Sequence, residues 1–121
     1  MKDIQNRQDL ELLTKVFYDK LLLDDRVNYI FTEVAKIDLE HHLPIITDFW
    51  EQSIFHTSGY KNNVFQIHQT LNHQEKLSAA HFDVWLDHFY QTVDTHFEGE
   101  NAEKIKTRAL SIATILKIKL Q

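Results

Sequence analysis

Hydrophobic residues recur at three- and four-residue steps in the first third of the chain, which is the spacing of an amphipathic helix. The first such stretch begins after Asn6, a suitable N-cap, and runs to about Leu23. Its apolar stripe consists of Leu10, Leu13, Phe17 and Leu21. A shorter helical piece follows from Val27 to Val34 and ends at a polar break over residues 36–38. The pattern predicts two helices that meet at a corner.

The same spacing returns from Asp38 to about Phe55, but a proline interrupts it. If Asp38 is the N-cap, Pro44 lies beyond the first turn, where it lacks an N–H and crowds the carbonyl group of Glu40. We therefore predict either a kinked helix or one that truly starts near His42.

Two further long helices are predicted in the second half of the chain. The first begins at Ser78 and stops at Gly99, and Asn101 then opens the second. Before them, residues 56–63 have turn chemistry and no period, and Val64 to Leu71 forms a short apolar segment that carries a histidine. This segment is too short to be stable as an independent helix, so we expect it to depend on what it packs against.

The composition supports an all-α protein with one domain over residues 1–121. A chain of this length can bury a single core, and two Gly with one Pro leave little material for the turns of an all-β fold. No Cys is present, which excludes disulfides and thiolate metal sites. Any metal must then be held by histidine, by carboxylate or by an exogenous ring.

The charge balance narrows the class of partner. The formal net charge is −5, and no cluster of lysine or arginine is present, so we expect neither a nucleic acid nor an anionic membrane as partner. No apolar run approaches the roughly 20 residues of a membrane span, and Met1 to Gln5 does not resemble a signal peptide. We expect a cytoplasmic protein.

Eight histidines are the one unusual feature of the composition. His68 stands apart because its neighbours Phe65, Ile67 and Leu71 are apolar, and a neutral imidazole in such a setting can bind iron. A hydrogen-bonded histidine at the edge of the core is the more common arrangement, so these residues alone leave both interpretations open. We assign surface or capping roles to His41, His56, His73, His81, His88 and His96. The histidine–glutamate spacings of di-iron bundles and zinc proteases are absent.

Taken in order, the motifs along the chain resemble those of the truncated haemoglobins of group III, across nearly its whole length. The matching motifs are Phe17-Tyr18, Ile30-Phe31, His42-Leu43-Pro44, Phe49-Trp50, Tyr60 eight residues before His68, His81-Phe82, Trp85-Leu86, Val93-Asp94, Arg108-Ala109 and Ile112-Ala113. Each motif is weak alone, but their order and spacing make the signal strong. The chain departs from the subgroup at Val84, where an arginine commonly partners a haem propionate, and Lys61 is a candidate replacement.

The resemblance implies a globin-like, two-on-two helical sandwich around haem b, which is iron protoporphyrin IX. It implies that His68 is the proximal metal ligand, that Tyr18 and Trp85 reach a bound diatomic ligand, and that His42 lies at the ligand entrance. The other residues expected to contact the cofactor are Phe31, Ile46, Phe49, Trp50, Tyr60, Phe65, Ile67, Leu71, Phe82, Phe89 and Ile112.

Three functions remain open at this point. The first is a haem protein that binds O2, and with it NO and CO, at an iron with an open or exchangeable position. The second is a globin enzyme with peroxidase-like or NO-detoxifying activity, which needs an external electron donor such as a reductase. The third is a haem-free helical interaction domain.

Overall fold

The computed structural model describes residues 1–60 and 63–120, and every regular element in that part of the chain is helical. The elements are α1 (Arg7–Leu22), η1 (Ile30–Val34), α2 (Leu39–Phe55), α3 (Val64–Gln74), α4 (Ala79–His96) and α5 (Glu100–Lys119). The prediction of an all-α protein is confirmed. Among these described residues, no helix is both long and apolar enough to cross a membrane.

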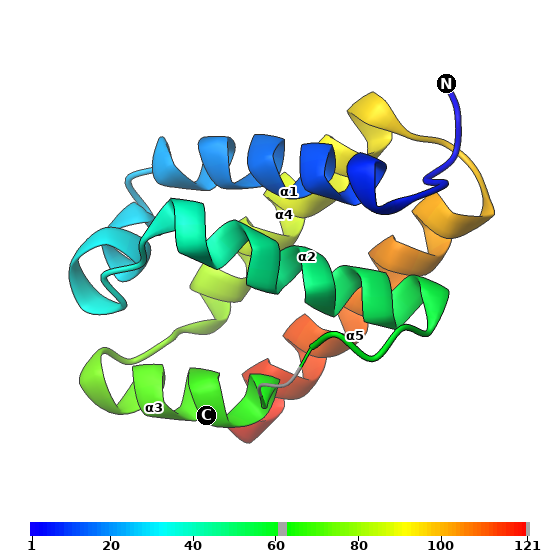
Figure 1. Ribbon diagram of the computed structural model, residues 1–121. Helices are drawn as coiled ribbons and strands as arrows, with labels where there is room; N and C mark the ends of the chain where they lie inside the picture. Colours follow the sequence, from blue (N-terminus) through cyan, green and yellow to red (C-terminus); the bar gives the residue numbers. More distant parts are fainter. Residues whose placement is uncertain (61–62, 121) are drawn as a thin grey trace.

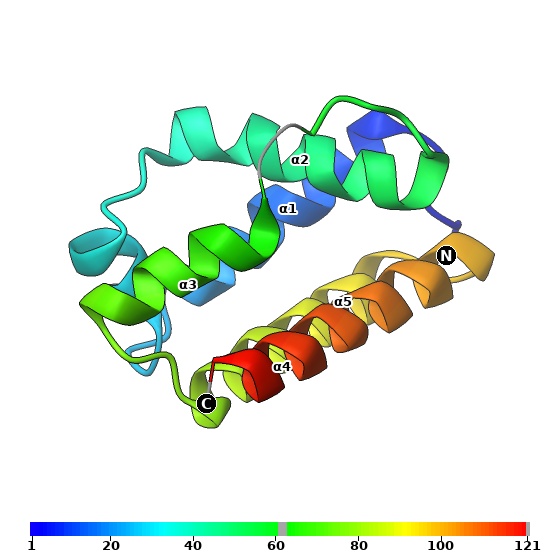
Figure 2. The ribbon, with the colours of Figure 1, turned by 90° about the horizontal axis from the view of Figure 1, so that it is seen from below.

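The long helices form two layers. Figures 1 and 2 show α1 beside α2 in one layer, α4 beside α5 in the other, and α3 along one side of the molecule. This is the two-on-two arrangement that the sequence predicts. The short piece after α1 is a π-helix, in which the N–H of Ala35 bonds the carbonyl oxygen of Ile30 at 2.8 Å. It is the short second helix predicted to meet α1 at a corner, although it begins at Ile30 and not at Val27.

Most helix boundaries follow their capping residues. The Asn6 side chain accepts a hydrogen bond from the N–H of Asp9 at 3.0 Å, and Ser78 caps α4. The prediction that Asn101 opens α5 is displaced by one residue, because the helix already begins at Glu100.

The start of α2 decides between the two alternatives raised by Pro44. The helix begins at Leu39 with Asp38 as its N-cap, and the N–H groups of His41 and His42 both bond the carbonyl oxygen of Asp38. The later start near His42 is therefore wrong, and Pro44 lies inside the helix. Because proline has no N–H, the carbonyl of the residue four positions earlier loses its helical partner.

The core lies where α1, α2 and α4 meet. Phe17 and Phe89 are almost fully buried, and the ring of Phe89 stacks on Trp50 with centroids 4.9 Å apart. By contrast, α3 contains no buried residue, although it is 11 residues long. This core holds the two layers together without α3, whose partly buried side chains pack against a second cluster that includes Phe82 and Leu116.

Candidate functional site

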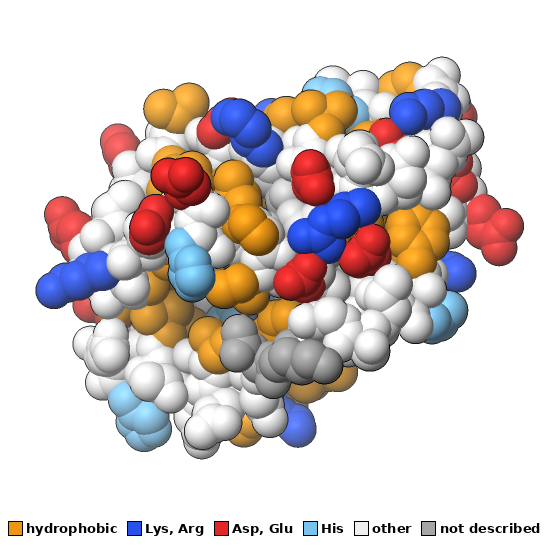
Figure 3. Space-filling view, viewed as in Figure 1, with side chains coloured by type: hydrophobic (Ala, Val, Ile, Leu, Met, Phe, Trp, Pro, Cys, Tyr) orange, Lys and Arg blue, Asp and Glu red, His pale blue; other side chains and the backbone are white. Residues whose placement is uncertain are grey.

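A cavity of about 470 Å³ lies between α2 and α3 and reaches inward to α1, α4 and the end of α5. Figure 3 shows this face of the molecule hollowed among hydrophobic side chains, with histidine at the edge of the hollow. The described lining residues include no lysine, arginine, aspartate or glutamate. Its polar lining consists of Tyr18, His42, Tyr60, His68, Thr70, Gln74, His81 and the indoles of Trp50 and Trp85. A volume of this size, mostly apolar with few polar groups, is typical of a cofactor or small-molecule site.

On the α3 side, the wall contains a histidine with a fixed orientation. Asn63 caps α3 by accepting from the N–H of Gln66, and one turn into the helix Nδ1 of His68 lies 2.8 Å from the carbonyl oxygen of Val64. A carbonyl oxygen only accepts, so Nδ1 carries the proton and donates it. Burial lowers the pKa of His68 below its ordinary value, although the bond to Val64 acts in the opposite direction. In the neutral ring Nε2 then keeps its lone pair, and none of the described residues pairs with that atom.

A tyrosine and a histidine meet on the opposite side of the cavity. Oη of Tyr18, on α1, lies 3.0 Å from Nε2 of His42, on α2. Burial raises the pKa of Tyr18 well above its ordinary value, so its hydroxyl stays protonated. Burial, and then the neighbouring charge of His41, lower the pKa of His42. The pair is therefore neutral at pH 7, and it presents a hydroxyl or an imidazole N–H as a hydrogen-bond donor to the cavity.

Aromatic rings fix the indole that lines the cavity from α4. Trp85 stacks on Phe89 with centroids 5.5 Å apart and an angle of 7°, and the edge of Phe17 meets it at 5.5 Å. A ring held on both sides has little freedom to turn, so the indole N–H has a defined direction. No described side chain accepts a hydrogen bond from it, which leaves this donor available.

The cavity contains one histidine whose position the sequence did not explain. His81 is the third residue of α4, and its Nδ1 accepts a hydrogen bond from the N–H of Ser78 at 3.1 Å in a capping box. Its Nε2 lies 3.0 Å from Oη of Tyr29, in the corner after α1. The capping role proposed for His81 is thus observed, but His81 also lines the cavity. A Ser-x-x-His capping box was the signal available in the sequence.

Most residues expected to contact a cofactor do surround this cavity. They are Tyr18, Phe31, His42, Ile46, Phe49, Trp50, Tyr60, Ile67, His68, Leu71, Phe82, Trp85 and Ile112. Lining residues that the sequence analysis did not single out for the site include Val34, Ile37, Ile45, Val64, Thr70, Gln74, Leu77 and Ala113. On α3 the lining residues Val64, Ile67, His68 and Leu71 follow the i, i+3, i+4, i+7 spacing of one helical face. Helical periodicity could therefore have identified Val64.

Two of the expected residues lie elsewhere. Phe65 is next to the cavity-facing side of α3, and its ring has Nζ of Lys119 at 5.1 Å. Phe89 lies one turn beyond Trp85, in the core behind the cavity wall. Both residues have the helical spacing expected of a cavity-lining position, but Phe65 points to one side of the cavity and Phe89 lies too deep. Spacing along the sequence specifies neither the exact direction nor the depth of a side chain. Lys61, the candidate partner for a propionate, lies outside the described residues.

The fold was compared with those of known proteins. No protein-family profile and no curated protein sequence matches the chain. Among solved structures, it is similar to the group III truncated hemoglobin from Campylobacter jejuni, with a TM-score of 0.88 and 22% sequence identity. The match covers 100% of this chain and 96% of the other. The protein therefore has the fold of a truncated haemoglobin.

Proposed function

We propose that this protein binds haem b in the cavity and uses it to bind O2, and with it NO and CO. The observation that carries the proposal is His68, a neutral imidazole in the wall of an apolar cavity of about 470 Å³, with Nδ1 bonded to a carbonyl oxygen and Nε2 unpaired with any described residue. A ring nitrogen with a lone pair is what iron requires, and a second bond that fixes the other nitrogen is the usual support for such a ligand.

The rest of the lining fits a flat apolar cofactor. Phe49, Trp50 and Phe82 offer aromatic surface, and the absence of charged side chains among the described lining residues suits an uncharged porphyrin core. When bound, haem would supply an iron atom that binds a diatomic gas. His68 would hold the iron through Nε2, and the apolar walls would exclude water from the ligand.

On the opposite side, the chain provides hydrogen-bond donors for a polarised diatomic ligand. The Tyr18 hydroxyl and the Trp85 indole N–H would each stabilise partial negative charge on the outer atom of O2, by roughly 1 to 3 kcal/mol. His42 sets how Tyr18 acts. If Nε2 of His42 carries a proton, it donates to Oη and leaves the hydroxyl hydrogen free for the ligand.

The test is a visible absorption spectrum of protein prepared with excess haem. We expect a Soret band whose position shifts when CO is added to the reduced protein. His68→Ala should lose most of the bound haem, whereas His73→Ala, a change at an exposed histidine of the same helix, should keep it. A colourless, fully folded wild type would refute the proposal and favour the haem-free interaction domain.

An enzyme remains the second candidate, because Tyr18 and His42 form a pair that could pass a proton to a polarised oxygen atom. Peroxidase-like or NO-detoxifying turnover would need electrons from outside the chain, such as those of a reductase. Stopped-flow kinetics separate the candidates. Slow O2 release without peroxide or NO consumption favours ligand binding alone, and rapid NO consumption with an added reductant favours the enzyme.

A further inference from the structure

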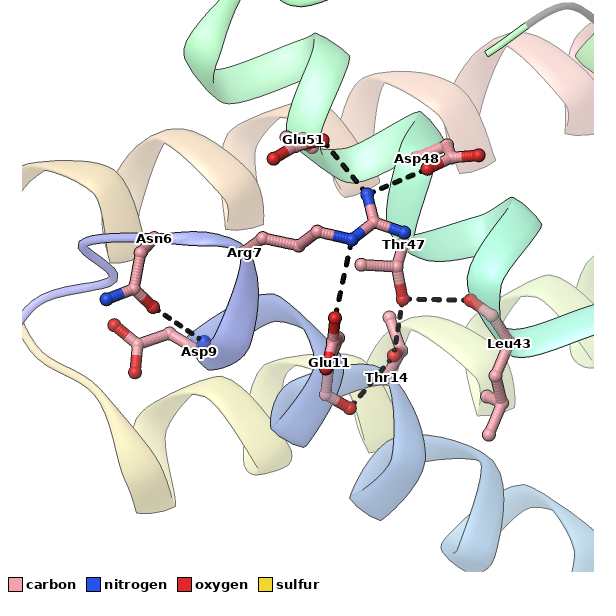
Figure 4. A network of polar contacts seen from close by, with 9 residues as sticks. All are labelled: Asn6, Arg7, Asp9, Glu11, Thr14, Leu43, Thr47, Asp48 and Glu51. Carbon is pink, nitrogen blue, oxygen red and sulfur yellow. Dashed lines mark hydrogen bonds and ion pairs between the residues drawn. The ribbon is translucent and has the colours of Figure 1, made fainter. Parts of the chain in front are cut away.

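Polar contacts link α1 to α2 at three successive levels. At the outer end, Arg7 reaches Asp48 at 2.7 Å and Glu51 at 2.9 Å. In the middle, the Oγ1 atoms of Thr14 and Thr47 lie 3.1 Å apart. Figure 4 shows these two levels. The third level is the bond between Tyr18 and His42 at the cavity. Residue numbers rise along α1 as they fall along α2, so the three contacts follow one line of antiparallel contact.

The middle contact is the only one of the three made entirely between fully buried side chains. Thr14 is 0% exposed and Thr47 is 1% exposed. Oγ1 of Thr47 donates to the carbonyl oxygen of Leu43 at 2.8 Å, and Oγ1 of Thr14 lies 3.1 Å from the carbonyl oxygen of Glu11. Each hydroxyl has one hydrogen, so Thr47 donates to Leu43, and Thr14 can donate either to Glu11 or to Oγ1 of Thr47. A slip of one helix along the other would break the directional contact between the two hydroxyls, although each hydroxyl would keep a carbonyl acceptor in its own helix.

This contact lies next to the donors that face the cavity. Thr14 precedes Tyr18 by one turn of α1, and the carbonyl group that accepts from Thr47 belongs to Leu43, the neighbour of His42. The backbone is less constrained here, because Pro44 cannot donate a helical hydrogen bond. Side-chain contacts must therefore contribute more to the placement of this part of α2.

We propose that the Thr14–Thr47 pair sets the register of α1 on α2 and thereby positions the Tyr18–His42 bond at the cavity. The ion pairs of Arg7 are partly exposed and are screened by solvent, so they fix the register weakly. Apolar contacts between the helices are non-directional and do not distinguish small displacements as sharply. The inference rests on the proposed function only in assigning Tyr18 and His42 to a ligand.

The experiment replaces the hydroxyls with methyl groups of similar size. We compare wild type with Thr14→Val, Thr47→Val and the double variant in the CO complex of the reduced holoprotein. We expect the C–O stretching band to broaden or split, and O2 dissociation to accelerate about threefold to tenfold, which corresponds to partial loss of one hydrogen bond. In a Tyr18→Phe background, where the tyrosine hydroxyl is already absent, the same threonine substitutions should change neither the C–O band nor O2 dissociation any further.

Two further variants separate positioning from general stability. Thr92→Val is the matched control, because Thr92 is also 0% exposed and donates to the carbonyl oxygen of His88 within its own helix. It should leave the C–O band unchanged. Thr47→Ser retains a hydroxyl and should restore the wild-type band. If a single valine variant is poorly folded, the double variant still decides, because it places methyl groups on both sides of the contact and buries no hydroxyl there.

A second measurement does not require haem. The ring nitrogens of His42, observed by NMR in ¹⁵N-histidine-labelled protein, should shift in the double variant and not in Thr92→Val. An unchanged His42 signal, together with an unchanged C–O band where CO binds, would overturn the inference. If the wild type binds no haem, the proposed function fails, and the His42 signal alone then decides whether the threonine pair positions the tyrosine–histidine bond.

Discussion

The side chain of Asp3 caps the N-terminus of α5, although Asp3 and Asn101 are 98 positions apart in the chain. Its Oδ2 accepts from the N–H of Asn101 and its Oδ1 from the N–H of Ala102, both at 2.8 Å. Burial of Asp3 acts to raise its pKa, but these bonds and the one from the N–H of Ile4 prevail and lower it. Gly99 leaves room for this contact, since a Cβ there would lie 2.5 Å from Cγ of Asp3. A carboxylate is well suited to this position, because the N–H groups and the dipole of α5 both favour negative charge.

We predict that Asp3→Asn lowers the free energy of unfolding by about 1 kcal/mol at pH 7, and Asp3→Ala by about 1 to 2 kcal/mol. The lowered pKa means that the carboxylate contributes fully above its ordinary value of 3.8 and loses its contribution as the pH falls below it. Urea denaturation at pH 7 measures the effect. Asp19→Asn, which removes an exposed ion pair with Lys15, is the control and should change stability by less than about 0.5 kcal/mol. An Asp3 variant as stable as this control would disprove the cap.

The sequence could not reveal Asp3 as a cap, because capping patterns are recognised only when cap and helix are adjacent in the chain. Asn6 and Ser78 satisfied that condition and were predictable. The same limit applies to the threonine pair, because its members are 33 positions apart. By contrast, the apolar neighbours of His68 left its role open, and the resemblance to a known family placed it beside a cofactor.

Among the elements, α3 depends most on what fills the space beside it. It has 11 residues and none of them is buried, whereas an isolated helix shorter than about 12–15 residues is marginal in water. Its ends are held by the cap at Asn63 and by the side chain of Asn72, which accepts from the N–H of Leu77, and its partly buried side chains pack against a cluster that includes Phe82 and Leu116. The sequence predicted this dependence from length alone. It could not predict that the contact surface of α3 would be mostly a cavity.

We therefore predict that α3 is the first element to lose structure when the cavity is empty. In hydrogen exchange on haem-free protein, amides of Val64–Gln74 should exchange much faster than those of α4 and α5. Addition of haem should slow exchange in α3 far more than elsewhere. Equal protection of α3 and α4 in the haem-free protein would show that α3 is held by contacts other than the cofactor.

For the whole molecule, an empty cavity would lower the free energy of unfolding by an amount comparable with the total stability of the protein. At roughly 24 cal/mol per Å³, an empty volume of about 470 Å³ costs on the order of 10 kcal/mol. That is comparable with the entire stability of about 5–15 kcal/mol of an ordinary domain. The helices themselves were predictable from hydrophobic spacing, whereas the two-layer arrangement was expected only from the family resemblance. The depth of the cavity was not predictable, because Phe89 and Trp85 share one helical face but end at different depths.

The expected consequence is a cofactor-dependent melting curve. We predict that haem-free protein melts well below the holoprotein, with a weakened near-ultraviolet circular dichroism signal from the aromatic residues around the cavity. Differential scanning calorimetry and circular dichroism with and without haem measure the difference. Identical melting temperatures would mean that the cavity closes without loss of stability, or that the cofactor binds elsewhere.

The lack of buried side chains in α3 also bears on the lifetime of the protein in a cell. Proteases cut segments that unfold, and a helix that detaches whenever porphyrin is scarce would offer such a segment in the middle of the chain. Newly made protein would then persist or be degraded according to the supply of porphyrin at that moment. If the cavity holds haem as proposed, the abundance of the protein would follow the supply of haem without any change in the transcription of its gene.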